Sequence, residues 1–208
     1  NRMTRVGLLA PGSEAAAYVA DRLRDRRQLT RARVHPINVL TALRTYAGGR
    51  GVRGKLGWTP VPEIVNALDD AFYLAFDGLA PTGRRYLLGL DVSGSMDHPV
   101  MDGTLTSREA AVALGMSIAA GEPDGAARAV AFTACRGMAP ELTPVDLSRR
   151  RRLDDVLQET RRMRFGGTDC ALPMLHALET GLEVDCFVIV TDNDSWAGEI
   201  HAAEALRR

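Results

Sequence analysis

The chain has 208 residues, of which 46% are apolar and 25% are charged, the proportions of an ordinary soluble globular protein. No apolar run approaches the roughly 20 residues that a membrane-spanning helix needs, and the N-terminus shows no signal peptide, so we expect no membrane association. Three cysteines, an odd number without metal-binding spacing, favour a reducing, cytoplasmic location. The formal net charge is zero, but residues 1–85 carry 14 Lys and Arg against 7 Asp and Glu, so the first part of the chain is basic and the rest is acidic.

The first 60 residues predict two amphipathic helices. The first is expected over residues 13–29, where Ser13 can cap it, and the second runs from about His35 to the pair Gly48-Gly49. Two helices joined by a short link need neighbours to bury their apolar faces, as in helical (HEAT-like) repeat arrays.

The loop at residues 48–58 combines five glycines with three cations and Trp58. It is interpreted either as a flexible basic surface for phosphates, with Trp58 available to stack on a base, or as a connector in which Trp58 is half buried. A third helix, over residues 62–76, carries one apolar face and is expected to pack against the sheet that follows.

The remainder of the chain alternates strands and helices, which predicts an α/β fold with a doubly wound parallel sheet and right-handed crossovers. The expected strands are residues 86–90, 129–132 and 186–190, with an edge strand at 138–143, and the expected helices are residues 107–120, 153–163, 172–182 and 202–208. We therefore divide the chain into a helical domain at residues 1–60 and an α/β domain at residues 61–208.

The strand at residues 86–90 leads directly into Asp91-Val-Ser93-Gly-Ser95. Gly94 permits a tight turn in which one carboxylate and two hydroxyls converge, and three hard oxygens suit Mg²⁺, Mn²⁺ or Ca²⁺ better than Zn²⁺. An aspartyl-phosphate enzyme would want a second carboxylate where Ser93 stands, and a phosphate loop would want several glycines and a Lys before its Ser or Thr. The remaining interpretation is that Asp91 and Ser93 only cap the following helix.

Two later loops supply matching oxygens. Gly166-Gly167-Thr168 brings a hydroxyl to the start of a helix, and the strand at 186–190 ends in Thr191-Asp192. Because ligands bind beyond the carboxyl ends of the strands in such sheets, Asp91 and Asp192 are expected to approach each other while Thr168 closes the third side. Together the three loops resemble the metal-ion-dependent adhesion site (MIDAS) of von Willebrand factor A domains. The resemblance implies a divalent cation, in the first place Mg²⁺ with Mn²⁺ or Ca²⁺ as alternatives, and these ligands: Asp91, Ser93, Ser95, Thr168 and Asp192.

A wider resemblance covers nearly the whole chain. The segments at residues 33–46, 51–58, 81–96, 166–174 and 191–198 are similar to the Ro 60 kDa autoantigen family. The resemblance implies a ring of helical repeats (the TROVE module) closed by a von Willebrand A domain. The chain begins inside that ring and stops before the last strands of the domain, so we expect a fragment.

The same resemblance implies binding of small non-coding Y RNA and of single-stranded ends of misfolded RNA, in RNA quality control. Phosphate binding needs cations clustered on one side, which the basic first part of the chain provides. The candidates for RNA contact are Arg31, Arg33, His35, Arg50, Arg53 and Lys55.

The metal site is interpreted as a binding device and not as a catalytic one. Hydroxyl ligands leave an ion more positive than a cage of carboxylates would, so an acidic group from a partner, such as an exoribonuclease or another protein, can complete its shell. The four histidines are scattered and specify no general base. Two alternatives stay open: a metal-dependent protein-interaction A domain with no RNA role, and a metal-dependent hydrolase.

Overall fold

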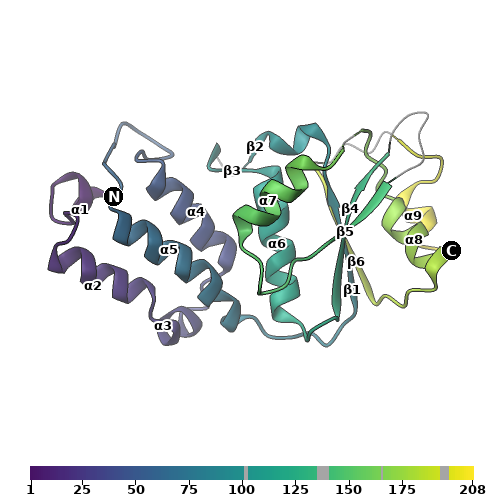
Figure 1. Cartoon of the computed structure of the whole chain (residues 1–208), viewed down its shortest axis with the longest axis horizontal. Helices are drawn as coiled ribbons and strands as arrows, with labels where there is room; N and C mark the ends of the chain where they lie inside the picture. Colours follow the sequence, from purple (N-terminus) through teal and green to yellow (C-terminus); the bar gives the residue numbers. More distant parts are fainter. Residues whose placement is uncertain (101–102, 135–140, 165, 193–196) are drawn as a thin grey trace. The chain divides into compact units, whose positions relative to one another are not determined.

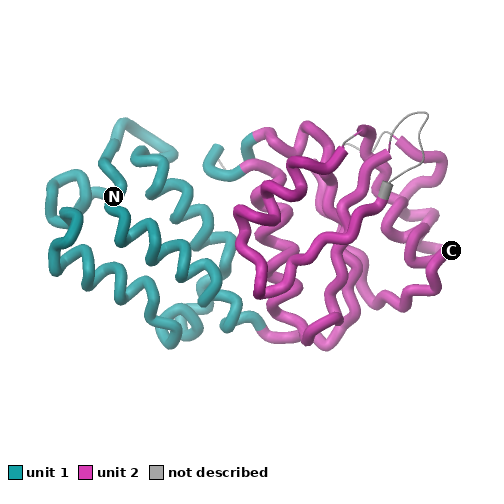
Figure 2. Tube along the Cα trace, in the orientation of Figure 1, with its two compact units in different colours: residues 1–79, 99–105 teal, residues 80–98, 106–208 magenta. Residues whose placement is uncertain are grey.

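The structure is a computed structural model that describes residues 1–100, 103–134, 141–164, 166–192 and 197–208. It forms two compact units, Asn1–Leu79 with Pro99–Leu105 and Ala80–His98 with Thr106–Arg208 (Figure 2). The division after residue 79 differs from the predicted boundary after residue 60, because a helix at Pro62–Leu74 groups with the helices before it. None of the described helices combines the length and the apolar character needed to cross a membrane.

The first unit is helical (Figure 1). Its elements are α1 (Arg2–Arg5), α2 (Glu14–Leu23), α3 (Arg26–Arg31), α4 (Pro36–Ala47), α5 (Pro62–Leu74) and the 3₁₀ turn η1 (Ala75–Gly78). The prediction of one helix over residues 13–29 was wrong, because the helix ends before Asp25. The Asp25 carboxylate accepts the Gln28 N–H at 3.1 Å and so caps the start of a second helix, α3. Ser13 caps α2 as predicted, its Oγ accepting the Ala16 N–H at 3.1 Å.

The core of the first unit forms where α5 packs against α2 and α4. The sequence predicted that α5 would pack against the sheet; its apolar face is present, but α5 packs against the helices α2 and α4. Trp58 belongs to this core, with 8% of its surface exposed and its indole N–H donating to the Tyr46 carbonyl at 2.9 Å. A role for Trp58 in stacking on a base is therefore excluded.

The second unit is an α/β domain with a four-stranded sheet, as predicted. Its strands are β1 (Tyr86–Asp91), β4 (Ala127–Thr133), β5 (Glu141–Val145) and β6 (Cys186–Val190), in the order β5-β4-β1-β6. β1 lies parallel to both β4 and β6, and β5 is an antiparallel edge strand. The first three residues of the predicted edge strand, 138–140, lie outside the described residues.

Helices cover both faces of this sheet. In Figure 1, α6 (Ser107–Gly121) and α7 (Leu153–Arg162) lie on one face, and α8 (Leu172–Thr180) and α9 (Ala202–Ala205) lie on the other. A short 3₁₀ turn, η2 (Gly94–Asp97), follows β1, and two further short strands, β2 (Pro99–Val100) and β3 (Leu105–Thr106), pair with each other.

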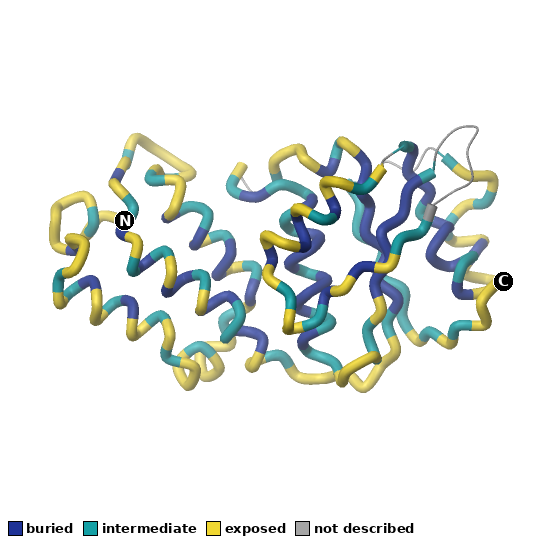
Figure 3. Tube along the Cα trace, in the orientation of Figure 1, coloured by how far each residue is buried: buried dark blue, intermediate teal, exposed yellow. Residues whose placement is uncertain are grey.

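β1 is buried along almost its whole length, as Figure 3 shows. Gly89 lets α8 approach this strand closely, since a Cβ there would lie 2.8 Å from both Pro173 Cγ and Ile189 Cδ1. Leu90 pairs with Val190 of β6, so the chain leaves the two strands side by side at Asp91 and Thr191. This edge of the sheet is where the predicted metal ligands begin.

Candidate metal centre

Asp91 is the most constrained carboxylate at this edge. Its side chain is 2% exposed, and Oδ1 accepts the Ser93 N–H at 2.7 Å. Oδ2 accepts two hydroxyl hydrogen bonds, from Thr168 at 3.1 Å and from Thr191 at 2.9 Å. Three hydrogen bonds offset much of the cost of burying a charged group, and they fix the orientation of Asp91 between the loops after β1 and β6 and the loop before α8.

The serines of the same loop lie together. Ser93 Oγ and Ser95 Oγ are 3.1 Å apart and share a hydrogen bond, and Ser93 is 6% exposed. Although Ser93 stands at the N-terminus of η2, its side chain makes no capping hydrogen bond there. The interpretation of Ser93 as a mere helix cap therefore fails, because its hydroxyl contacts the Ser95 hydroxyl instead.

Asp192 reaches the same edge through the register of β6. It follows Thr191, and its Oδ1 is buried without a hydrogen-bond partner among the described residues. A buried carboxylate oxygen left unsatisfied is costly, and a bound cation would supply the missing interaction. Asp192 is therefore compatible with the predicted role of a metal ligand.

The donor set as a whole fits a hard cation. It offers carboxylate and hydroxyl oxygens, the ligands that Mg²⁺, Mn²⁺ and Ca²⁺ take, and no nitrogen or sulfur. In the described part of the chain, no group of three or more His, Cys, Asp or Glu side chains could hold a metal ion, so a zinc-type cluster is not found there.

The loop that carries Thr168 is held by its neighbours. The Thr168 carbonyl accepts the Ala197 N–H at 3.1 Å, and Asp169 Oδ1 accepts the Ala171 N–H at 2.9 Å. A Cβ on Gly198, whose φ is +90°, would overlap the Asp169 carboxylate, so the two segments meet closely at a glycine. Burial raises the pKa of Asp169 above its usual value.

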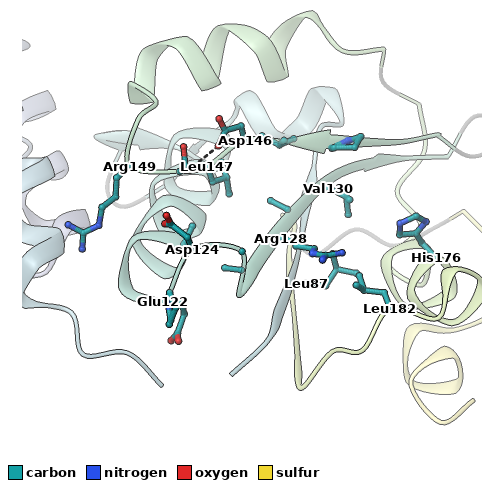
Figure 4. Close-up of a pocket in the computed structure, with 18 residues that line it drawn as sticks. Leu87, Glu122, Asp124, Arg128, Val130, Asp146, Leu147, Arg149, His176 and Leu182 are labelled. Atoms are coloured by element: carbon teal, nitrogen blue, oxygen red, sulfur yellow. Dashed lines mark hydrogen bonds between the residues drawn. The ribbon is translucent and has the colours of Figure 1, made fainter. Parts of the chain in front are cut away.

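A hollow of about 470 Å³ lies at the other end of β4 (Figure 4). Its lining includes Leu87, Arg128, Val130, His176 and Leu182, and none of the five predicted metal ligands. The candidate metal centre is therefore separate from this hollow.

The six predicted RNA-contact residues are all exposed, but they form two groups. Arg31, Arg33 and His35 precede α4, whereas the other three follow it: Arg50, Arg53 and Lys55. The 12 residues of α4 separate the groups by about 18 Å. His35 also caps α4, its Nδ1 accepting the Ile37 N–H at 3.2 Å. The helix predicted from about His35 to Gly48-Gly49 already lay between the two groups in the sequence, and α4 confirms it.

Two further residues lie at the candidate metal centre that were not predicted from the sequence. Thr191 orients Asp91, and its position directly after a buried strand and before Asp192 was the available signal. Arg108, in the first turn of α6, reaches the same loop and had no signal in the sequence, because a lone Arg in a helix is usually exposed.

The parallel sheet, its helical cover and the oxygen cluster at its carboxyl edge define a von Willebrand factor A-type domain. Residues 85–208 match the model of the Ro60 vWA domain family, and the chain belongs to this family. The predicted resemblance and the predicted α/β fold are thereby confirmed.

Relatives match beyond the A-type domain. RNA-binding protein RO60 of Deinococcus radiodurans is 44% identical over 205 residues, which are 97% of this chain and 37% of the relative. RNA-binding protein RO60 of Caenorhabditis elegans is 43% identical over 207 residues, 100% of this chain and 31% of the relative. The crystal structure of the Deinococcus radiodurans RO (RSR) protein matches 99% of this chain and 40% of its own, with a TM-score of 0.88 and 42% identity. The chain thus spans less than half the length of these relatives.

Proposed function

We propose that this chain is part of a Ro-type RNA-binding protein that acts in the cytoplasm as a non-enzymatic component of RNA quality control. The observation that carries the proposal is the identity of 43–44%, along nearly the whole chain, to two proteins named RNA-binding protein RO60. The RNA ligands are small non-coding Y RNA and the single-stranded ends of misfolded RNA, and their phosphates meet the exposed cations of the first unit.

Ion pairing narrows the set of cations that are available to phosphates. Around α2 and α3, three arginines are paired: Arg22 with Asp25, Arg24 with Asp70 and Arg26 with Asp77. The side chains of Arg27, Arg31 and Arg33 are exposed and make no hydrogen bond or ion pair with any described residue. No carboxylate of the described residues therefore offsets the charge of these three arginines, which is available to a ligand.

Two matched triple variants test the RNA proposal. Replacing Arg27, Arg31 and Arg33 with Gln removes three unpaired cations, and replacing Arg22, Arg24 and Arg26 with Gln removes three paired ones, an equal change in net charge. We expect the first variant to weaken binding of a single-stranded RNA and to lower the slope of log K against log salt by about 0.7 for each lost phosphate contact. The variant that replaces the paired arginines should change both the affinity and the slope less.

The measurement is filter or fluorescence binding by the full chain over a series of KCl concentrations. RNA binding that neither depends on salt nor differs between the two variants would contradict phosphate recognition by this surface. Absence of RNA binding by the unmutated chain would contradict the function itself.

The second unit contributes the metal centre. We infer that Asp91, Ser93, Ser95, Thr168 and Asp192 hold a divalent cation, in the first place Mg²⁺, with Asp91 and Asp192 coordinating directly or through water. The bound ion supplies a site of concentrated positive charge for an acidic group of a partner protein, such as an exoribonuclease. Its test is electron density at this cluster in crystals grown with Mn²⁺ or Mg²⁺.

One observation favours a second candidate function, a metal-dependent protein-interaction module with no RNA role. The unsatisfied Asp192 oxygen favours a bound cation, and such a cation would receive an acidic side chain of a partner protein without any RNA. EDTA separates the two functions, because partner capture through the metal should fail with the chelator whereas phosphate contacts on the first unit should survive. Phosphoester turnover with Mn²⁺ that disappears in Asp91→Ala would instead identify a hydrolase.

A further inference from the structure

Arg108 is a buried cation beside the candidate metal centre. It lies in the first turn of α6, and its side chain is 3% exposed. Nη2 donates to the Ser93 carbonyl at 3.1 Å, and Nε donates to Asp97 Oδ1 at 2.9 Å. A weaker contact joins Nη1 to the Thr160 carbonyl at 3.5 Å.

The contacts of Arg108 with the Ser93 carbonyl and with Asp97 lie at the two ends of the turn that carries the serine hydroxyls. Ser93 begins this turn, Ser95 lies within it and Asp97 ends it. Because a guanidinium is planar, it can hold both ends of the turn at a fixed separation, which a single ammonium group cannot. The distance between the ends of the turn therefore depends on Arg108.

The first turn of α6, which carries Arg108, is itself fixed by hydrogen bonds. Thr106 and Glu109 form a reciprocal capping box at the start of α6, with Thr106 Oγ1 accepting the Glu109 N–H and Glu109 Oε2 accepting the Thr106 N–H. The positive charge of Arg108 would by itself oppose a nearby cation, but the Asp97 carboxylate, whose Oδ1 lies 2.9 Å from Arg108 Nε, offsets it.

We propose that Arg108 is a positioning residue of the metal centre, which sets the separation of the Ser93 and Ser95 hydroxyls and through it the affinity for the cation. The inference rests on the proposed metal binding and adds a residue that touches no ion. Replacing a residue that orients a metal ligand without touching the ion typically changes the affinity for the metal by about 10–100-fold. We expect Arg108→Lys, which keeps the charge but loses the two-ended contact, to weaken Mn²⁺ binding by about that factor.

Arg149, which is exposed whereas Arg108 is buried, offers a control at the opposite end of α6. Its Nε and Nη2 donate to the Ala120 carbonyl at 3.1 and 2.7 Å, far along the helix from the metal loop. Arg149→Lys also loses a two-donor contact between an arginine and a backbone carbonyl. It should lower stability without changing the affinity for Mn²⁺.

The experiment measures Mn²⁺ affinity by titration calorimetry and stability by urea unfolding without metal, on the full chain and on both variants. A loss of affinity in Arg108→Lys but not in Arg149→Lys supports the proposal. If Arg108→Lys is less stable yet binds Mn²⁺ as the unmutated chain does, its role is purely structural and the proposal is overturned. Should Arg108→Lys not fold, Asp97→Glu, which keeps the charge but moves the carboxylate at one end of the same contact, must weaken Mn²⁺ binding. If the unmutated chain binds no Mn²⁺, the metal centre itself is refuted, an outcome distinct from the failure of Arg108 alone.

Discussion

Replacing Thr168 and Thr191 separately with Val distinguishes a metal ligand from a residue that only orients one. Both hydroxyls donate to the same atom, Asp91 Oδ2, at 3.1 and 2.9 Å. Val keeps the shape of Thr but removes the donor. Since a hydrogen bond to a charged group contributes about 1.5–3 kcal/mol, each variant should lose stability within that range when no metal is present, and the two losses should be similar.

The two variants should differ once metal is added. At a concentration of 100 times Kd, a ligand stabilises the unmutated protein by about 2.7 kcal/mol. Loss of an orienting hydrogen bond in Thr191→Val, at about tenfold weaker binding, would leave a gain of about 1.4 kcal/mol. Loss of a direct ligand in Thr168→Val, at about 100-fold or weaker binding, would leave about 0.4 kcal/mol or less.

The assay is urea unfolding of each protein with and without Mn²⁺, at a concentration set by the Kd of the unmutated chain. Each variant is the control for the other, because both lose one hydrogen bond to Asp91 and only Thr168 is assigned as a ligand. Equal metal-induced stabilisation of the two variants would refute the assignment of Thr168 as a ligand.

Three further predictions follow from other parts of the second unit. Asp192→Asn should leave the metal-free protein as stable or slightly more stable, because it replaces an unsatisfied buried carboxylate oxygen with a neutral amide. The same variant should lose all stabilisation by Mn²⁺ in the same unfolding assay. Retained stabilisation would exclude Asp192 as a ligand. Gly89→Ala should lower the free energy of unfolding by about 1–3 kcal/mol, because the new Cβ meets Pro173 and Ile189 at 2.8 Å, whereas Gly57→Ala, whose Cβ has only an ordinary contact at 3.6 Å, should not suffer such overpacking. Arg85 holds the pKa of Asp185 well below its usual range, so the stability that this pair contributes is present above the pKa of about 3.9 of an unfolded Asp and is lost as the pH falls below it. Asp185→Asn should therefore flatten the fall in unfolding free energy between pH 5 and pH 2, and an unchanged slope would contradict the pairing.

The sequence was most informative where a local pattern decides the structure. A run of apolar residues ending at Asp91 predicted a buried strand, and a second run ending at Thr191-Asp192 predicted a parallel neighbour; the register of Leu90 with Val190 confirms that the two strand ends meet. Parallel strands end at the same edge of a sheet, so this part of the site followed from strand direction alone.

It was least informative where the partner of a residue lies far along the chain. The apolar face of α5 was visible, but nothing in its periodicity distinguished a helix from a sheet as its partner. Trp58 stood among glycines and cations, yet its indole found the Tyr46 carbonyl in the helical core. Arg108 is the extreme case, because its burial depends on contacts with Ser93, Asp97 and Thr160, which only the folded domain brings together.

On the proposed function, the two units would recognise anions in two physically different ways. The first unit presents guanidinium groups on an exposed surface, whose attraction for phosphates is long-ranged and is screened by salt. If the second unit binds the proposed ion, recognition of a carboxylate there would depend on that ion and fail with a chelator. Salt should therefore act chiefly on RNA binding and EDTA chiefly on protein capture. A single preparation of the chain can assign each partner to its unit by the agent that releases it.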